Sequence, residues 1–211
     1  MEMKMSQADM QSLMNRLMRL IRLDTTVFDE VRLDASTTIP SIIVAAVSML
    51  LTGLGGWLYW VMTAPTDAGG SDVFLKSALL GSALALLLWV AWVGVAYLLL
   101  TQVFRAQADI QQLIRTMGMA MIPLALTILM FIPGVSFGIA LAAVALTFGL
   151  STMAIQAATN ASPAQVLLAN AAGIAVWALV LTVLSGDIEA TRSGISINSY
   201  APGIFLFALG T

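Results

Sequence analysis

Five long apolar stretches between Ile39 and Leu184 constrain this chain more than any other feature. Their centres carry no charged side chain. The length of each stretch matches the roughly 20 residues that a helix needs to cross the hydrocarbon layer of a bilayer. Because lipid offers no partner for backbone polar groups, we expect each stretch to be an α-helix. The sequence therefore predicts an all-α fold, a polytopic transmembrane helical bundle. The expected spans are about 39–63, 73–101, 116–132, 135–157 and 164–184.

The composition agrees with this class and excludes several functions. The chain is 60% hydrophobic and 9% charged, against roughly 45–50% and 25% in ordinary soluble domains. Nine Lys and Arg against eleven Asp and Glu leave no basic surface for nucleic acid. Cysteine and histidine are absent from the sequence, which excludes disulfides, thiol catalysis and imidazole-held metal or haem. We therefore expect no cofactor, no metal site and no catalytic residues.

Three regions are expected along the chain. Residues 1–38 form a cytoplasmic amphipathic segment, residues 39–184 the five-helix transmembrane domain, and residues 185–211 a tail on the non-cytoplasmic side. The tail is polar until it reaches a short apolar run at residues 204–209. That run is too short to cross a bilayer, so we expect it to dip into the surface or to dock on a partner.

Residues 1–22 are predicted to form a helix with two different faces. Apolar side chains recur at three- and four-residue spacing, and arginines gather on the other side. The residues that define these faces are Leu13, Met14 and Leu17, and Arg16, Arg19 and Arg22. Such a helix beside a membrane segment favours the headgroup layer, with its arginines on anionic lipid. The alternative is a helix that binds a partner, because methionine adapts to irregular grooves.

Four carboxylates follow this helix closely, namely Asp24, Asp29, Glu30 and Asp34. A cluster of this kind can be interpreted as a metal site, but its spacing fits no ion-binding loop. Aspartate also caps helices, and acidic residues are favoured at the positive N-terminal end of a helix. We therefore expect helix caps and a solvated face.

Two features are predicted to shape the third and fourth spans. Gly118 and Pro123 lie inside the third span, and proline in a helix removes a backbone hydrogen bond and bends the helix. Pro133 and Gly134 leave room only for a very tight turn, so these two spans should form an antiparallel hairpin.

The fourth span carries a row of small residues at helical spacing. The row consists of Gly134, Gly138, Ala142, Ala145 and Gly149. In lipid, apolar burial gives helices little reason to associate, so close backbone approach through small residues becomes important. The row is therefore predicted to be a helix-packing face, which meets either the same chain or another copy.

The distribution of basic residues predicts the orientation. Seven of the nine lie in the N-terminal segment or between the second and third spans, against two on the other side. The first group is Lys4, Arg16, Arg19, Arg22, Arg32, Arg105 and Arg115, and the second is Lys76 and Arg192. Basic residues favour the cytoplasmic side of a membrane. We therefore expect a multi-pass protein of the plasma (cytoplasmic) membrane with a cytoplasmic N-terminus and a C-terminus on the opposite face.

Several segments together resemble bacterial members of the Yip1 family of integral membrane proteins, over roughly residues 13–184. They are NRLMRLIRLD at 15–24, VFDE at 27–30, LIRTMGMAMIP at 113–123, IPG at 132–134 and MAIQAA at 153–158. The resemblance implies five spans and a cytoplasmic N-terminus, and the tail after Leu184 departs from it. The adaptor role of eukaryotic members in vesicle traffic depends on longer cytoplasmic regions and is not carried over.

The expected function is a non-enzymatic membrane scaffold or accessory subunit, and a large energy-converting complex is one assembly that could use such a subunit. Its partners would be membrane lipids and other integral membrane proteins or further copies of the chain. The alternative is a small-solute permease or channel, which needs polar groups facing an internal cavity and for which the helix break at Gly118 to Pro123 is the best candidate. An intramembrane enzyme would need a nucleophile with a base or paired carboxylates at depth, and the sequence offers neither.

Overall fold

A computed structural model describes residues 7–63, 73–132 and 134–185 of the chain, and within these ranges it consists of helices joined by short connectors. Five helices are long and apolar enough to cross a membrane. They are Ala35–Thr63, Phe74–Val103, Ile110–Phe131, Ser136–Ala158 and Pro163–Leu184. The predicted all-α bundle of a multi-pass membrane protein is confirmed, and each span includes most of the range expected for it.

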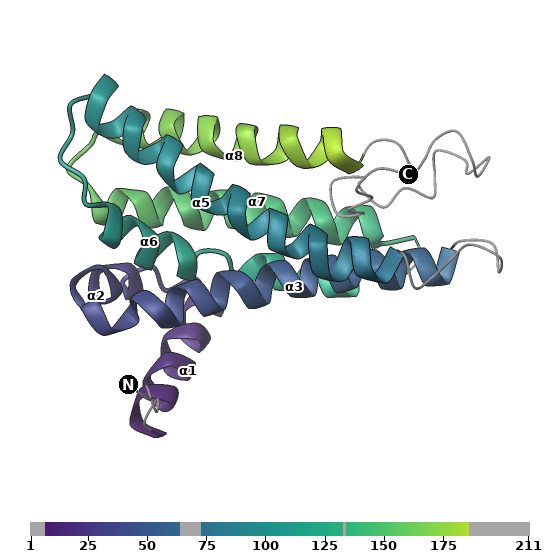
Figure 1. The fold of residues 1–211 in the computed structure, drawn as a ribbon. Coiled ribbons are helices and arrows are strands. Elements are labelled where there is room, and N and C mark those ends of the chain that lie inside the picture. The colour runs from purple at the N-terminus through teal and green to yellow at the C-terminus, as the bar shows by residue number, and fades with distance from the viewer. Residues whose placement is uncertain (1–6, 64–72, 133, 186–211) are drawn as a thin grey trace.

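The N-terminal region precedes the bundle as two short helices. Helix α1 (Gln7–Ile21) lies across the direction of the long helices, and α2 (Val27–Leu33) covers one end of the bundle (Figure 1). A short 3-10 turn, η1 (Ala35–Thr37), then leads directly into α3 (Thr38–Thr63), the first span. The Asp34 carboxylate caps this turn by accepting a hydrogen bond from Ser36 N.

The second span is one continuous rod with three backbone geometries. It runs from the π-helical segment η2 (Phe74–Gly81) through α5 (Ser82–Leu98) to a second π-helical segment, η3 (Leu99–Val103). Gly81 and Leu99, at the two junctions, both keep right-handed helical dihedral angles, so the rod is not interrupted.

The third span is interrupted near the predicted kink. Helix α6 (Ile110–Met119) ends just after Gly118, and a 3-10 helix, η4 (Ile122–Phe131), begins with Pro123 in its first turn. A 3-10 helix has three residues per turn, so every third side chain falls on one face. The residues with this spacing are fully buried, namely Met121, Leu124, Thr127 and Met130.

The start of α6 corrects the expected boundary of the third span. The third span was predicted to begin at about residue 116, but residues 110–115 already form the first turns of α6. The Asp109 side chain accepts hydrogen bonds from Gln111 N and Gln112 N at 2.7 and 3.1 Å and so begins the helix. An aspartate before an apolar residue is an N-cap signal, and the polar glutamines that follow concealed it.

The third and fourth spans are neighbours in space, as the hairpin prediction requires. Gly134 has a φ of +85°, a backbone conformation that glycine adopts without strain, and Pro133 lies outside the described residues. Helix α7 (Ser136–Ala158) then packs along η4. Helix α8 (Pro163–Ser185) returns beside α5, and its end lies at the opposite end of the bundle from α2 (Figure 1).

Close helix packing depends on glycines that were not predicted to serve it. A methyl group added at Gly55 would overlap the backbone of Thr127 in η4, and one at Gly118 would lie 2.6 Å from the Ser41 carbonyl oxygen. Gly173 lies against Trp92 in the same way. Gly118 is therefore a contact point between α6 and α3 as well as the residue before the helix break.

The predicted packing row on α7 is not packed within this chain. All five of its residues, Gly134, Gly138, Ala142, Ala145 and Gly149, are exposed, and an added methyl group at any of the three glycines would meet nothing within 4 Å. The face of α7 that the bundle buries contains Ala140, Ala143, Thr147, Leu150 and Ala154. Contact of the row with its own helices is therefore excluded for the described residues, and contact with another molecule stays a prediction.

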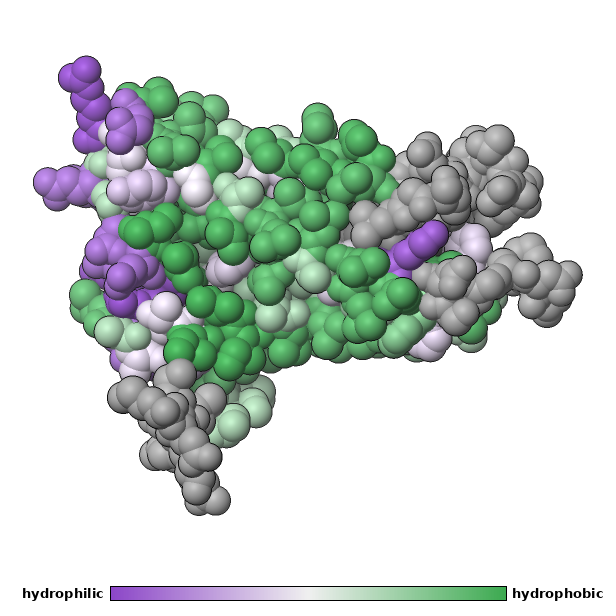
Figure 2. Space-filling model, viewed as in Figure 1, coloured by the Kyte–Doolittle hydropathy of each residue, from purple (hydrophilic) through white to green (hydrophobic). Residues whose placement is uncertain are grey.

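The surface divides into a polar end and an apolar flank. Figure 2 shows hydrophilic residues gathered at the end of the bundle that carries α2, with hydrophobic residues over most of the visible flank. We call the end with α2, the 104–109 segment and the 159–162 connector the polar end. Large apolar side chains such as Leu87, Leu141 and Leu179 are exposed on the flank, as a bilayer-facing surface requires.

Candidate functional site at the polar end

The two arginines of α1, Arg16 and Arg19, bind α2 and the connectors on either side of it, and so depart from the prediction that they face lipid. The Arg16 guanidinium lies 3.0 Å from an Asp34 carboxylate oxygen. Arg19 donates to Asp24 at 2.8 Å and to Glu30 at 2.7 Å. The carboxylates that follow α1 therefore neutralise its cations, whereas Arg22 is exposed.

Helix α1 has two neighbouring apolar stripes and not a single one. Leu13 and Leu17 are half-buried against the core, and Leu20 is fully buried. The other stripe is exposed, and its members Met10, Met14 and Met18 are 53%, 55% and 49% accessible. Of the two apolar stripes, the methionine stripe is thus the one available to the headgroup layer or to a partner.

The carboxylates of the connectors are held in their charged form. The pKa of Asp24 is lowered from 3.8 to about 2. The largest cause is a hydrogen bond from the Thr26 hydroxyl, and the second is a hydrogen bond from Arg19. A hydrogen bond from the Ser36 hydroxyl and a second from Arg16 lower the pKa of Asp34. Asp34 accepts a hydrogen bond from Ser36 N and caps η1, which agrees with the predicted capping role. Asp24 accepts one from Thr26 N within the connector, and α2 begins after Thr26 without a side-chain cap.

Arg115 joins three elements at the polar end. It is only 8% exposed, and it is the only buried charged residue in the described part of the chain. Its guanidinium donates to the Thr38 hydroxyl at 2.7 Å, to the Arg32 carbonyl oxygen at 3.0 Å and to the Gln111 amide oxygen at 3.3 Å. Burying a charge is costly unless hydrogen-bond partners surround it, so the guanidinium requires all three partners. These contacts therefore hold α2 and the start of α3 against α6.

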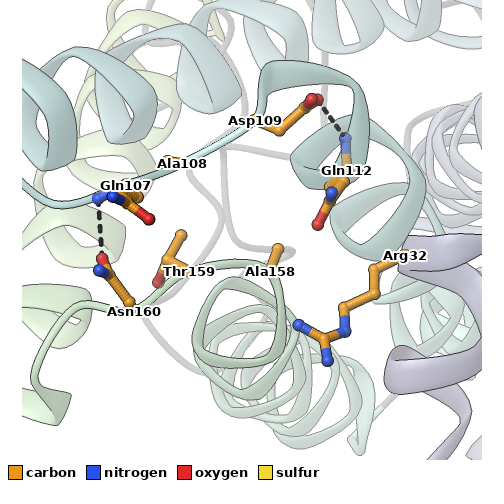
Figure 3. Close-up of a pocket in the computed structure, with 8 residues that line it drawn as sticks. All are labelled: Arg32, Gln107, Ala108, Asp109, Gln112, Ala158, Thr159 and Asn160. Atoms are coloured by element: carbon orange, nitrogen blue, oxygen red, sulfur yellow. Dashed lines mark hydrogen bonds between the residues drawn. The ribbon is translucent and has the colours of Figure 1, made fainter.

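A cavity of about 390 Å³ opens beside this junction (Figure 3). Its walls come from α2, from the segment that leads into α6, and from the connector between α7 and α8. The residues that line it are Arg32, Gln107, Ala108, Asp109, Gln112, Ala158, Thr159 and Asn160. The sequence does not reveal this site, because its walls come from segments that lie far apart in the chain and carry no known motif.

Backbone pairing holds the two loop walls of the cavity together. Ala108 and Thr159 form an isolated antiparallel bridge. Gln107 N donates to the Asn160 side-chain oxygen at 2.7 Å, and Asn160 N donates to the Gln107 carbonyl oxygen at 3.4 Å. The cavity is therefore part of the packed structure of this end.

Polar groups deeper in the bundle hold helices together. The Trp92 indole donates to the Asn170 side-chain oxygen at 3.0 Å, and the Asn170 amide donates to Ser151 at 2.9 Å. Thr127 donates to Thr52 at 2.9 Å across α3 and η4. Hydrogen bonds of this kind stabilise helix association in lipid.

Comparison of the chain with protein-family models, with curated proteins and with solved structures finds no match. The resemblance to the Yip1 family therefore stays a prediction that rests on the quoted segments.

Proposed function

We propose that the protein is a non-enzymatic integral membrane scaffold or accessory subunit that packs against partner membrane proteins or lipids. The observation that carries this proposal is the exposed row of small residues on α7. Gly138, Ala142, Ala145 and Gly149 follow one another at spacings that keep them on one side of the helix, and all four are exposed. A row of this type lets a second helix approach closely.

The interior polar groups support a structural role. A permease needs polar groups around a hydrated passage. Here the Asn170 and Thr127 groups are satisfied by neighbouring helices. Arg115, the buried cation, has its partners at the polar end, in α2, at the start of α3 and in the first turn of α6.

The interrupted third span is the observation that favours the permease alternative, because broken helices form substrate sites in transporters. Ala120 and Met121 form the break and Met119 ends α6 beside it, and all three are fully buried. Side chains therefore fill the point at which a substrate would have to bind, and we prefer the scaffold.

We further propose that the polar end is cytoplasmic and that the membrane is the plasma (cytoplasmic) membrane. Four arginines form hydrogen bonds at this end, namely Arg16, Arg19, Arg32 and Arg115, and a fifth, Arg105, lies in the 104–109 segment. Positive charge concentrated on one side of the spans favours the cytoplasmic side.

The test is co-purification from native membranes in a mild detergent. Leucine replacements in the row, Gly138→Leu and Ala142→Leu, should abolish stoichiometric recovery of a membrane partner or of a second copy, measured by native mass spectrometry. The control is Leu141→Phe, which changes an exposed position on the same helix outside the row. Recovery of the unaltered protein only as a monomer would refute the scaffold role, and so would equal association of all variants.

A further inference from the structure

We propose that the cavity at the polar end binds a phosphate group, carried by a phospholipid headgroup or by a soluble phosphate ester. This inference does not depend on the scaffold role. It rests on the juxtaposition of one arginine with three side-chain amides at the mouth of a cavity of suitable size.

Arg32 supplies the positive charge. Its Nη1 donates to the Ala157 carbonyl oxygen at 2.9 Å, which holds the guanidinium at the cavity wall. Its Nε is buried without a hydrogen-bond partner, although the Asp29 carboxylate lies 3.4 Å away. Figure 3 shows the guanidinium directed into the space between α2 and the connector that follows α7. An arginine with spare donors is well suited to phosphate oxygens.

Side-chain amides supply further donors. Gln112 extends from α6 toward the space above Arg32, and Gln107 and Asn160 line the opposite wall (Figure 3). The Asn160 oxygen is already bound to Gln107 N, so its amide nitrogen is the group left to donate. Together these amides give donors on both sides of the cavity.

Asp109 is the one acidic residue that lines the cavity. One of its carboxylate oxygens accepts two backbone N–H groups of α6, so that oxygen is engaged with the helix. The positive N-terminal end of α6 further offsets its charge. Two carboxylates therefore lie near a bound phosphate, Asp109 in the cavity wall and Asp29 at Arg32 Nε on the side away from the amides, and the phosphate would meet the Nη groups of one guanidinium and three amides.

The size and place of the cavity fit a small phosphorylated group. Its volume of about 390 Å³ lies within the ~300–1,000 Å³ usual for small-molecule sites. It lies within the polar end, where α6 begins and α7 ends. We consider both a lipid headgroup and a soluble ester as sources of the phosphate.

The decisive variant is Gln112→Glu, which replaces an amide donor with a negative charge of nearly the same shape. Gln112 lies in the first turn of α6, where a carboxylate is favoured, so the variant should fold. The matched control is Gln111→Glu, which adds the same charge one residue away and outside the cavity. A second control is Arg22→Gln, at an exposed arginine of the same end.

Binding is measured on the full chain in nonionic detergent by thermal stabilisation and by phosphorus NMR. The probes are a short-chain phosphatidylglycerol, glycerol phosphate, and the matching diacylglycerol, which lacks phosphate. We expect Gln112→Glu to bind the phosphate probes about tenfold more weakly or worse, because a hydrogen bond to a charged group is lost. Both controls should bind as the unaltered chain does.

The pattern across probes identifies the source of the phosphate. Saturable binding of phosphatidylglycerol alone supports a lipid headgroup, and binding of glycerol phosphate supports a soluble ester. Equal binding of the diacylglycerol would overturn the proposal, because the tails alone would then explain it. Absence of binding, or equal weakening by Gln111→Glu and Gln112→Glu, would overturn it as well.

Discussion

Gly55 is the position at which the packing of this bundle can be tested most sharply. The change is Gly55→Ala. The added methyl group would overlap the Thr127 carbonyl oxygen and lie 2.9 Å from the carbonyl carbon, whereas ordinary van der Waals contact begins at 3.4 Å. Because these atoms belong to backbone and cannot rotate away, α3 and η4 must move apart by about half an ångström or more. Overpacking of this kind costs about 1–3 kcal/mol.

The control for this change is Gly149→Ala, on the exposed row of α7. Nothing lies within 4 Å of the added methyl group at that position. Both variants gain the same helix propensity of about 1 kcal/mol, so their difference isolates the steric cost. Equilibrium unfolding in mixed micelles should therefore give Gly55→Ala a free energy of unfolding about 1–3 kcal/mol below that of Gly149→Ala. Equal free energies of unfolding would refute the close contact between α3 and η4.

Three further outcomes follow from the polar contacts. Asn170→Leu leaves the buried Trp92 indole without its hydrogen-bond acceptor and should lower the free energy of unfolding by about 1–3 kcal/mol in the same assay. An unchanged free energy of unfolding would contradict the hydrogen bond between Trp92 and Asn170. Arg115→Met removes three hydrogen bonds and should raise the rate of amide hydrogen exchange in α2 without affecting the rate in α8. Equal changes of the rate in both helices would contradict the role of Arg115 in holding α2 against α6. Because the pKa of Asp24 falls from 3.8 to about 2 on folding, its stabilising contact with Arg19 is complete above about pH 4 and lost as the pH falls toward 2. Spin labels on α1 and α2 should then separate over that range, and a constant distance would contradict the ion pair.

The spans could be predicted from sequence because the bilayer imposes one strong rule, a long apolar segment with its backbone paired internally. The break in the third span was also predictable, since Pro123 cannot continue an α-helix without losing a hydrogen bond. The change to a 3-10 helix after it was not. It depends on the periodic burial of Leu124, Thr127 and Met130, and burial is a tertiary property.

The polar end shows where sequence patterns are insufficient. Arg16 and Arg19 lie on the basic face of an amphipathic helix, and the pattern does not reveal that carboxylates 5–18 residues further on would bind them. Small residues are equally ambiguous. The row that includes Gly138 points outward, whereas Gly55 and Gly173, which are not part of any evident row, make the close contacts. Spacing identifies a face, but only the fold decides what covers it.

The number and direction of the crossings can be measured directly, because the natural chain contains no cysteine. Single cysteines replace Asp67, Gln107 and Ser193, and intact cells are treated with a thiol reagent that does not cross membranes. Five spans with a cytoplasmic polar end predict labelling at positions 67 and 193, and labelling at 107 only after the cells are permeabilised. Labelling of position 107 in intact cells, or of only one of the other two, would contradict the topology.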